Sequence, residues 1–412
     1  MAAPLPLRRN RDFVLLEIGR FLSAIGSQSS AIAYPLLVLA LTHSPAKAGI
    51  VAFARAIPQP ILSVLAGVAA DRGDRKRQMI LADVFRATAV GALGILVLAG
   101  DARWWVIPIV ALIEGTGSTL FSAASIGALR AVVPPRQVPA AVGAQRARMS
   151  ASALAGPPLG GALFQLGRAL PFLADAGSYA CSVVSLLGMH TPFQQPRERN
   201  TAPVHKQIAE GFHYLWSRPF LRTSAFLYGL GNPLMPAIFL VVVVVGRRQG
   251  LTGGEIGALT ASLGAAAFAG SIASPVARRV LSIRTIMLLE YLTWFGAWFF
   301  VAWPTVYALL AVIVPFGIAA PITDSVVIGY RVALTPDRLL GRVETVEDTI
   351  ALMLWPPGPL IAGLLLAQVS ARATVAVFAT FAMSLLIWAW LSPAIRAAPS
   401  LDELGEAATL RD

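Results

Sequence analysis

Residues 66–78 read Ala-Gly-Val-Ala-Ala-Asp-Arg-Gly-Asp-Arg-Lys-Arg-Gln, and a long apolar run stands on either side of them. The stretch holds six charged residues: Asp71, Arg72, Asp74, Arg75, Lys76 and Arg77. Because charged side chains are costly inside hydrocarbon, the stretch is predicted to be a short loop at one face of a membrane. The two apolar runs beside it are then predicted to be membrane-spanning helices.

The composition also indicates a protein with many membrane spans. Of the 412 residues, 56% are hydrophobic and only 13% are charged, and the mean hydropathy is +0.69. In a soluble chain about a quarter of the residues are charged. We expect twelve spans, each near the ~20 residues that cross a bilayer: 13–41, 46–69, 79–99, 104–126, 142–167, 171–191, 219–245, 254–275, 284–303, 305–329, 343–369 and 371–392.

The distribution of basic residues predicts the orientation. Lysine and arginine are concentrated in the two tails and in alternate loops, and few lie in the opposite loops: Lys47, Arg103, Arg168, Arg247, Arg248 and Arg372. By the positive-inside rule, both termini are predicted to be cytoplasmic. The first apolar run is too long for the core of a signal peptide, so residues 1–12 are expected to be a cytoplasmic tail.

Several function classes are disfavoured by what the spans contain. The net charge of +12 is accounted for by the loops, so no nucleic-acid partner is expected. Cys181 is the single cysteine, and it lies in an apolar run. The four histidines stand at span ends or in the central loop, and no phosphate-binding loop of the Walker type is present. We therefore expect no enzyme activity, metal or cofactor, and no direct use of ATP.

The two halves of the sequence repeat each other. The glycine and the bases of residues 67–76 recur at 270–279, and the Gly-Pro pattern of 156–161 recurs at 358–363. A nearly constant offset close to half the chain predicts two six-helix bundles with a cavity between them. The predicted domains are residues 1–191, a linker over 192–218 that starts polar and becomes an amphipathic helix in the membrane interface, and residues 219–412.

The charged loop resembles a known motif. Its pattern Gly67-x-x-Ala70-Asp71-Arg72-x-x-Arg75-Lys76 is similar to the loop between the second and third helices of the major facilitator superfamily. The stretch 335–343 and the Gly-rich fifth span extend the resemblance, closest to the branch that holds enterobactin exporters and macrolide efflux proteins. That span is similar to the antiporter motif of drug–proton exchangers, with Ser152 in place of one glycine and with Gly143, Gly156, Pro157, Gly160 and Gly161 at the matching positions.

The resemblance implies an all-α, twelve-span major facilitator fold in a bacterial cytoplasmic membrane. It further implies a monomer, surrounded by lipid, that exports amphipathic small molecules by proton antiport and alternating access. Three alternatives stay open: a dedicated exporter of a siderophore or secondary metabolite, a lipid or uptake carrier of the same fold, and a sensor that transports nothing.

The charged loop has two interpretations. As a gate, Asp71 would lie near a helix N-terminus of the opposite half, and Arg75 would pair with an acid such as Asp83, Glu347 or Asp348. As an anchor, the bases would only orient the protein. The gating interpretation, which the resemblance favours, involves Gly67, Asp71, Arg72, Arg75, Asp83, Arg86, Glu347 and Asp348.

Glu114 is the charge nearest the middle of a predicted span. It is a candidate proton carrier or counter-charge for a cationic substrate. The alternative is a structural acid paired with a buried base such as Arg20, Arg55 or Arg146. Relatives tend to carry an acid where Ser27 stands here, so proton coupling is expected to use another residue.

Polar and aromatic side chains on the spans that line the cavity in similar proteins are candidate pocket residues. With Glu114 and Arg55, they are Gln28, Tyr34, Tyr228, Asn232 and Asp324. Asn232, Pro233 and Pro236 are expected to interrupt the seventh helix and expose backbone carbonyls. Glu290 is expected to be peripheral, at the membrane interface or paired with Arg284.

Overall fold

The computed structural model describes residues 7–191, 193 and 204–398, and all of its regular secondary structure in these ranges is helical. The chain divides into two compact units. Unit 1 comprises residues 1–198 and 246–261, and unit 2 comprises residues 199–245 and 262–412. The polar start of the linker that was predicted from the sequence, at 194–200, lies outside the described residues.

Unit 1 is built mainly from seven α-helices. They are α1 (Arg11–Thr42), α2 (Pro45–Ala56), α3 (Pro58–Arg72), α4 (Arg75–Ala99), α5 (Val106–Val132), α6 (Val138–Leu166) and α7 (Leu170–Leu187), with short 3-10 turns at Leu7–Arg9 and Pro135–Gln137. Caps in the sequence define several of their ends. The Asn10 side chain accepts a hydrogen bond from the Phe13 amide at the start of α1, and Asp74 does the same for Arg77 at the start of α4.

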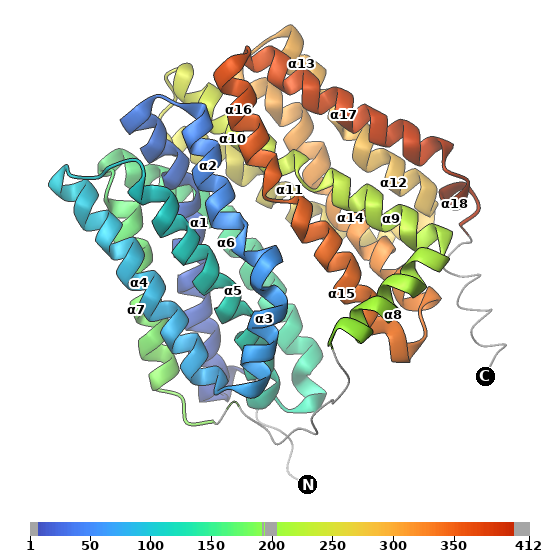
Figure 1. Cartoon of the computed structure of the whole chain (residues 1–412), viewed down its shortest axis with the longest axis horizontal. Helices are drawn as coiled ribbons and strands as arrows, with labels where there is room; N and C mark the ends of the chain where they lie inside the picture. Colours follow the sequence, from blue (N-terminus) through green and yellow to red (C-terminus); the bar gives the residue numbers. More distant parts are fainter. Residues whose placement is uncertain (1–6, 192, 194–203, 399–412) are drawn as a thin grey trace. The chain divides into compact units, whose positions relative to one another are not determined.

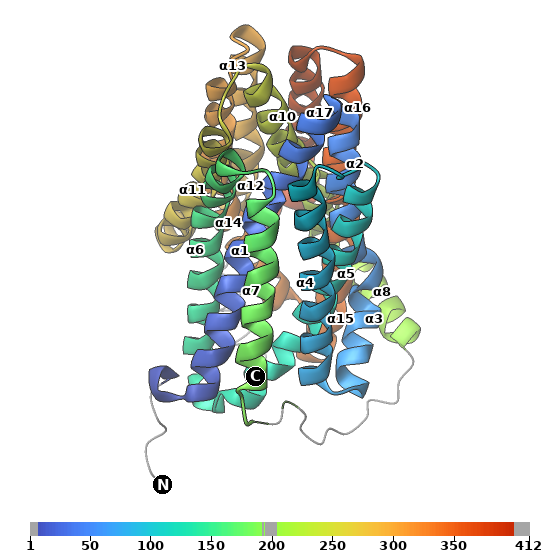
Figure 2. The ribbon, with the colours of Figure 1, turned by 90° about the vertical axis from the view of Figure 1, so that its left-hand side faces the viewer.

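The helices of unit 1 pack side by side (Figure 2). α1 lies against α6 and α7, α4 lies against α5 and α7, and α3 covers α5. Near the charged end of the unit, the core between these helices contains the buried side chains of Leu16, Met79, Phe121 and Leu186. This packing brings polar residues of α1, α2, α4, α5 and α7 toward a common interior.

Unit 2 holds the remaining helices (Figure 1). They are α8 (Val204–Ser217), α9 (Pro219–Gly231), α10 (Leu234–Arg248), α11 (Gly253–Val280), α12 (Ile283–Leu292), α13 (Ala297–Ala302), α14 (Leu310–Leu334), α15 (Asp337–Leu354), α16 (Pro357–Gln368), α17 (Ala371–Leu391) and α18 (Pro393–Arg396), with 3-10 turns at Thr293–Gly296 and Val306–Leu309. The end of α10 and the first part of α11, residues 246–261, belong to unit 1. Within unit 2, α12 packs on α14 and α17, and α15 packs on α8 and α9.

Prolines divide three of the long helical segments. α2 gives way to α3 at Pro58, and α15 gives way to α16 at Pro357. The seventh predicted span is interrupted between Gly231 and Leu234, where Pro233 stands, as the sequence predicted. Proline lacks the amide hydrogen that an uninterrupted helix needs, which explains the breaks.

Among the described residues, eleven helical segments are long and apolar enough to cross a membrane. The predicted fifth span corresponds to α6, which is 29 residues long but is not one of the eleven. Its first half contains Gln145, Arg146 and Arg148, which lower its hydropathy. α6 is nevertheless long enough to cross a bilayer, and the prediction of a twelfth span at this place stays a prediction.

Candidate functional site

A buried ion pair joins α2 to α5 in unit 1. Arg55, at the end of α2, donates from Nη2 to Glu114 Oε1 at 2.7 Å and from Nε to the same oxygen at 3.2 Å. The same Nη2 donates to the backbone carbonyl of Ser27 at 3.0 Å. Glu114 is 1% exposed. Of the three arginines considered from the sequence as partners of Glu114, the structure therefore selects Arg55.

Aromatic side chains enclose this pair. The Tyr179 hydroxyl, from α7, donates to Glu114 Oε1 at 3.2 Å and lies 2.8 Å from the Ser27 hydroxyl. Tyr34 is buried edge-on against Phe172, and its ring centroid is 6.0 Å from Cζ of Arg55. Three of the candidate pocket residues, Tyr34, Arg55 and Glu114, are therefore brought together, and Tyr179 joins them.

A second buried pair lies next to the first. Arg86 and Asp83, three residues apart on α4, form an ion pair, and both are at most 4% exposed. The Arg86 guanidinium stacks over the ring of Tyr179 at 4.2 Å and over the ring of Phe121 at 5.0 Å. A cation between aromatic faces is stabilised by their ring electrons. Tyr179 thus contacts both arginine–acid pairs.

Asp175 is a third buried acid in this region, and the sequence interpretation missed it. It lies on α7, one turn before Tyr179, and its side chain is completely buried. The available signal was an acidic residue within the predicted sixth span, 171–191. We call Arg55, Asp83, Arg86, Glu114 and Asp175 the polar cluster of unit 1.

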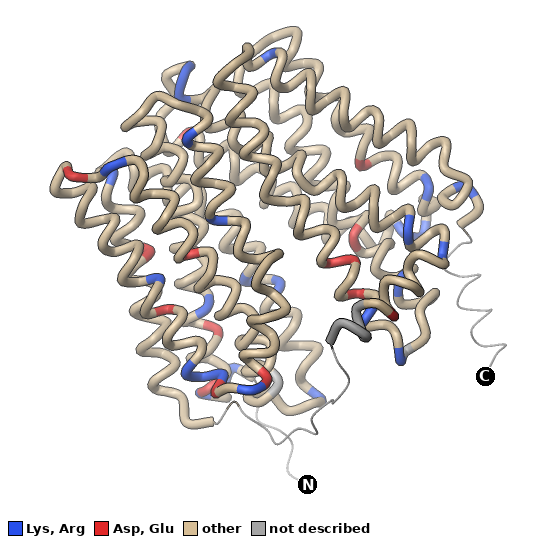
Figure 3. Tube along the Cα trace, viewed as in Figure 1, with Lys and Arg blue, Asp and Glu red and all other residues tan. Residues whose placement is uncertain are grey.

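The charged loop is held within unit 1. Arg75 donates to Asp71 Oδ1 at 3.0 Å and to the carbonyls of Ala70 and Phe193. The expected pairing of Arg75 with Asp83 is therefore wrong in this structure, because Asp83 lies more than two helical turns further along α4, where it is buried against Arg86. Figure 3 shows acidic and basic residues gathered at this end of unit 1, where α3 meets α4.

The other residues assigned to the gate are placed as follows. Gly67 faces open space, and Arg72 is exposed. In unit 2, Glu347 of α15 pairs with Arg331 of α14, and Asp348 lies 4.0 Å from the same arginine. Glu347 and Asp348, the other expected partners of Arg75, therefore interact with Arg331, which belongs to their own unit.

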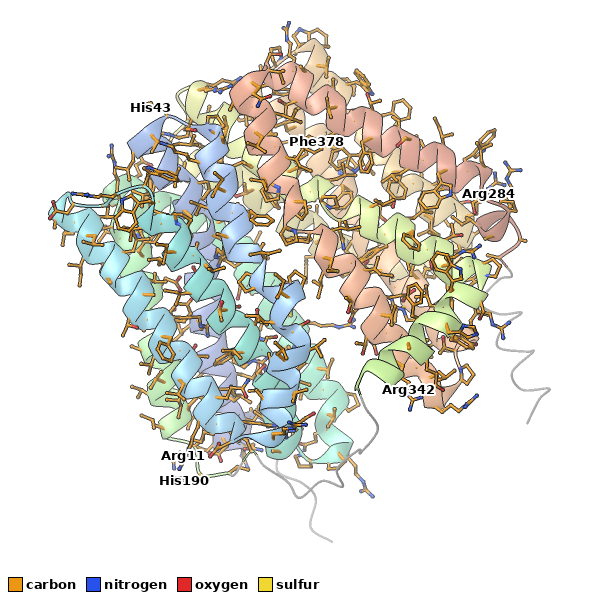
Figure 4. The ribbon with its side chains drawn as sticks, in the orientation of Figure 1. Arg11, His43, His190, Arg284, Arg342 and Phe378 are labelled. Carbon is orange, nitrogen blue, oxygen red and sulfur yellow. The ribbon has the colours of Figure 1, made fainter. Side chains whose placement is uncertain are left out.

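Side chains near the charged loop bind the backbone of the segment that follows α7. Lys76 donates to the Met189 carbonyl at 2.8 Å, and Asp12 of α1 accepts from the amides of His190 and Thr191. Figure 4 shows Arg11 and His190 at this same end of unit 1, with His43 at the other end. The segment after α7 is thus fixed by bases on its carbonyls and by an acid on its amides.

The Gly-rich pattern of α6 makes close backbone contacts. A methyl group at Gly161 would overlap the carbonyl oxygen of Gly253, and one at Gly257 would overlap the Pro157 carbonyl oxygen. Gly160 and Gly156 face α1 in the same way, at Ser29 and Gln28. Gly143, the first glycine of the pattern, has open space around it. Small residues therefore let α6 approach both α1 and the start of α11.

The repeated pattern in unit 2 has a matching contact. A methyl group at Gly358, at the start of α16, would overlap the Pro233 carbonyl oxygen at the break between α9 and α10. Here α16 meets the seventh predicted span, as α6 meets the first span in unit 1. The repeat in the sequence thus corresponds to repeated helix packing.

The candidate pocket residues of unit 2 form their own group. The Tyr228 hydroxyl and the Asp324 carboxyl are hydrogen-bond partners, and Glu290 lies close enough to interact with Asp324. Asn232 donates to the Ala351 carbonyl at 2.8 Å, which ties the break after α9 to α15. Glu290 was expected to be peripheral or paired with Arg284, and the structure instead places it beside Asp324. Within the described ranges, no three His, Cys, Asp or Glu side chains gather closely enough to hold a metal ion.

Known proteins resemble the chain in both sequence and structure. It is 26% identical over 368 residues to a protein named multidrug efflux pump Tap from Mycolicibacterium fortuitum, covering 85% of this chain and 88% of that one. It is 25% identical over 346 residues to the enterobactin exporter EntS of Shigella boydii, covering 82% and 81%.

Solved structures share the fold. A bacterial homologue of the human lysosomal transporter Spinster, in an inward-facing conformation, aligns with a TM-score of 0.75 and 15% identity over 94% of this chain and 98% of that one. A point mutant of the nucleoside transporter NupG aligns with a TM-score of 0.73 and 12% identity over 92% and 99%. The predicted all-α fold is thereby confirmed.

The family model of the Major Facilitator Superfamily matches residues 16–343, which is most of the chain. The match includes the charged loop, the Gly-rich α6 and the polar cluster of unit 1. It also agrees with the relatives and the fold. The chain therefore belongs to the major facilitator superfamily and is a membrane transporter rather than an enzyme.

Proposed function

We propose that this transporter is a secondary active exporter of amphipathic small molecules, which exchanges its substrate for protons by alternating access. The observation that carries the proposal is the buried Arg55–Glu114 pair, which lies among the membrane-spanning helices of unit 1. The similarity to a protein named as a multidrug efflux pump, and the antiporter-like glycine pattern of α6, support export over uptake.

A purely structural role explains the pair poorly. Two charges taken out of water lose solvation that their attraction barely repays, so apolar side chains of similar size would stabilise the bundle as well. Charges inside a membrane bundle are instead typical of substrate and ion pathways. Because the Arg55 side chain is 28% exposed while Glu114 is 1% exposed, the pair has one accessible and one enclosed partner. This arrangement suits a site that a substrate or a proton reaches from the arginine side.

The remaining features belong to the same proposal. Both termini are cytoplasmic in the bacterial cytoplasmic membrane, which places the charged loop on the cytoplasmic side. Residues 1–191 and 219–412 act as the two moving bundles, with 192–218 as their link, and the protein works as a monomer. The Asp71–Arg75 pair and the contacts of Arg75 with the end of α7 belong to the cytoplasmic gate and break when it opens.

A dedicated exporter of a siderophore or secondary metabolite is the second candidate. It is favoured by the similarity to a protein named as an enterobactin exporter, which covers most of both chains. The two candidates differ in how many unrelated compounds are moved. A multidrug pump transports hydrophobic cations of several scaffolds, whereas a dedicated exporter ignores them.

The test is proton-gradient-driven flux of a fluorescent hydrophobic cation into inverted membrane vesicles. We compare the wild type with Glu114→Gln and use Asp101→Asn, an exposed acid in the α4–α5 loop, as the matched control. Three results together support the proposal: flux in the wild type requires the proton gradient, flux is lost in Glu114→Gln, and flux persists in Asp101→Asn. Unchanged flux in Glu114→Gln would remove this pair from the mechanism. Absence of flux in the wild type would overturn the multidrug proposal, and the same vesicles would then be tested with a catechol siderophore.

A further inference from the structure

The polar cluster of unit 1 contains more acids than bases. Its three acids are Asp83, Glu114 and Asp175, and its two bases are Arg55 and Arg86. Arg55 is bound to Glu114, and Arg86 is bound to Asp83. If every group were ionised, the cluster would hold one uncompensated negative charge inside an apolar bundle.

Asp175 is the acid of this cluster that no ion pair joins to a base among the described residues. Its side chain is completely buried on α7 and faces α1, where a methyl group at Gly26 would lie 2.6 Å from Asp175 Oδ1. The Ser178 hydroxyl is 3.4 Å from the same oxygen, and the Ser30 hydroxyl is a further neighbour. Oδ2 has no hydrogen-bond partner in the described part of the chain. Its immediate neighbours are therefore hydroxyls and backbone.

The charged groups that face Asp175 come from three other helices. Glu114 of α5 repels a negative charge at Asp175, while Arg55 of α2 and Arg86 of α4 attract one. Tyr179 lies one turn further along α7. Both arginines are already bound to other carboxylates, Arg55 to Glu114 and Arg86 to Asp83. Burial without a paired cation favours the neutral carboxylic acid over the carboxylate.

We propose that Asp175 is the proton-binding residue of this transporter, and that Glu114 serves as the partner of Arg55. The proposal rests on the proton antiport of the proposed function and assigns its proton to a residue that the sequence did not single out. The unpartnered Oδ2 is the oxygen that bears the proton. Asp175 then corresponds to the one acid that the two arginines leave uncompensated.

Release of the proton alters the whole cluster. The O–H bond at Oδ2 breaks, and the electron pair stays on the Asp175 carboxylate. The proton passes to a water molecule that enters from the side of Arg55. The new negative charge lies near Arg55 and Arg86 and competes with Glu114 and Asp83 for them. Arg55, which is the more exposed of the two arginines, is then free to shift toward Asp175 and to loosen Glu114.

The first test detects the proton without requiring transport. Infrared spectra of the purified full-length protein in lipid are recorded through a pH titration in H2O and in D2O. The wild type is expected to show the C=O band of a protonated carboxylic acid, which shifts in D2O. The band is expected to lose intensity in Asp175→Asn and to keep its intensity in Asp83→Asn, the matched variant of a buried acid that has its own arginine. Presence of the band in Asp175→Asn at the wild-type intensity would overturn the proposal, as would its absence from the wild type.

The second test measures coupling in the vesicle assay. Flux of the fluorescent cation is compared with and without a pH gradient, and Asp175→Asn is expected to lose the stimulation by the gradient. Stimulation of the variant equal to that of the wild type would overturn the assignment of the proton to Asp175. A wild type without flux but with the Asp175-dependent infrared band would overturn the proposed function while leaving the buried neutral acid in place. Thermal unfolding of Asp175→Asn in detergent, expected to match the wild type because Asp175 has no ion-pair partner to lose, verifies that the Asn side chain preserves the fold; Asp83→Asn is expected to unfold at a lower temperature and is measured where it is still folded.

Discussion

Replacement of Arg55 by methionine removes the cation beside Glu114 but keeps an unbranched side chain along the same path. Glu114 is 1% exposed, and it then relies on neutral donors such as the Tyr179 hydroxyl at 3.2 Å. Breaking a buried ion pair by removal of one partner costs about 3–5 kcal/mol. Because the Arg55 side chain is 28% exposed, we expect the lower end of this range, about 3 kcal/mol of lost unfolding free energy.

The double variant Arg55→Met/Glu114→Leu tests the origin of this loss. Exchange of a whole buried pair for apolar residues is often neutral, so the double variant is expected within about 1 kcal/mol of the wild type. Arg103→Met, an exposed arginine in the α4–α5 loop, is the control and should stay within about 0.5 kcal/mol.

The assay is equilibrium unfolding of the purified protein in mixed micelles, followed by tryptophan fluorescence. The losses of unfolding free energy in Arg55→Met and in Glu114→Leu are then compared with the loss in the double variant. Two outcomes would refute the conclusion that a member of this pair is costly only when its partner is removed. One is a loss in the double variant that equals the sum of the losses in the two single variants. The other is a loss below about 1 kcal/mol in Arg55→Met.

Two further predictions concern the helix contacts. Gly161→Val and Gly257→Val should each lower the unfolding free energy by about 1–3 kcal/mol in the same assay, because the new side chain overlaps backbone atoms. Gly143 has open space around it, so Gly143→Val is the control and should lower the unfolding free energy by less than either. Asp12→Ala should cost about 1–3 kcal/mol by leaving the amides of the segment after α7 unpaired, and should speed proteolysis there; equal cleavage of variant and wild type would contradict the role of Asp12.

The spans and the family could be predicted from sequence because both depend on local patterns. Apolar runs of sufficient length and a charged loop between them specify helices and their ends without knowledge of neighbours. The amphipathic stretch after the first half forms α8, and Pro233 interrupts the helix where it was expected to. The antiporter-like glycines are likewise explained by contacts that admit no side chain.

The partners of the charged residues could not be predicted in the same way. Arg75 pairs with Asp71 and not with Asp83 because of how each helix is rotated about its own axis. A mostly apolar sequence does not specify that rotation. Glu114 was correctly seen as a buried acid, but three arginines were equally plausible for it. Asp175 was missed because a single acid near the start of a span is readily assigned to the membrane interface. Only the packing of α7 against α1 shows that it is enclosed.

The same helix connects the charged loop with the polar cluster. α7 carries Asp175 and Tyr179 in its first ten residues, and Lys76 and Arg75 bind backbone carbonyls of the segment that follows its C-terminal end. A change in charge at Asp175 acts on the arginines around the start of α7, while the bases of the loop restrain the residues that follow its end. Coupling between two sites requires an element that both of them bias. In unit 1 that element is α7, so the proposed proton release at Asp175 and the proposed opening of the loop would both act through this one helix.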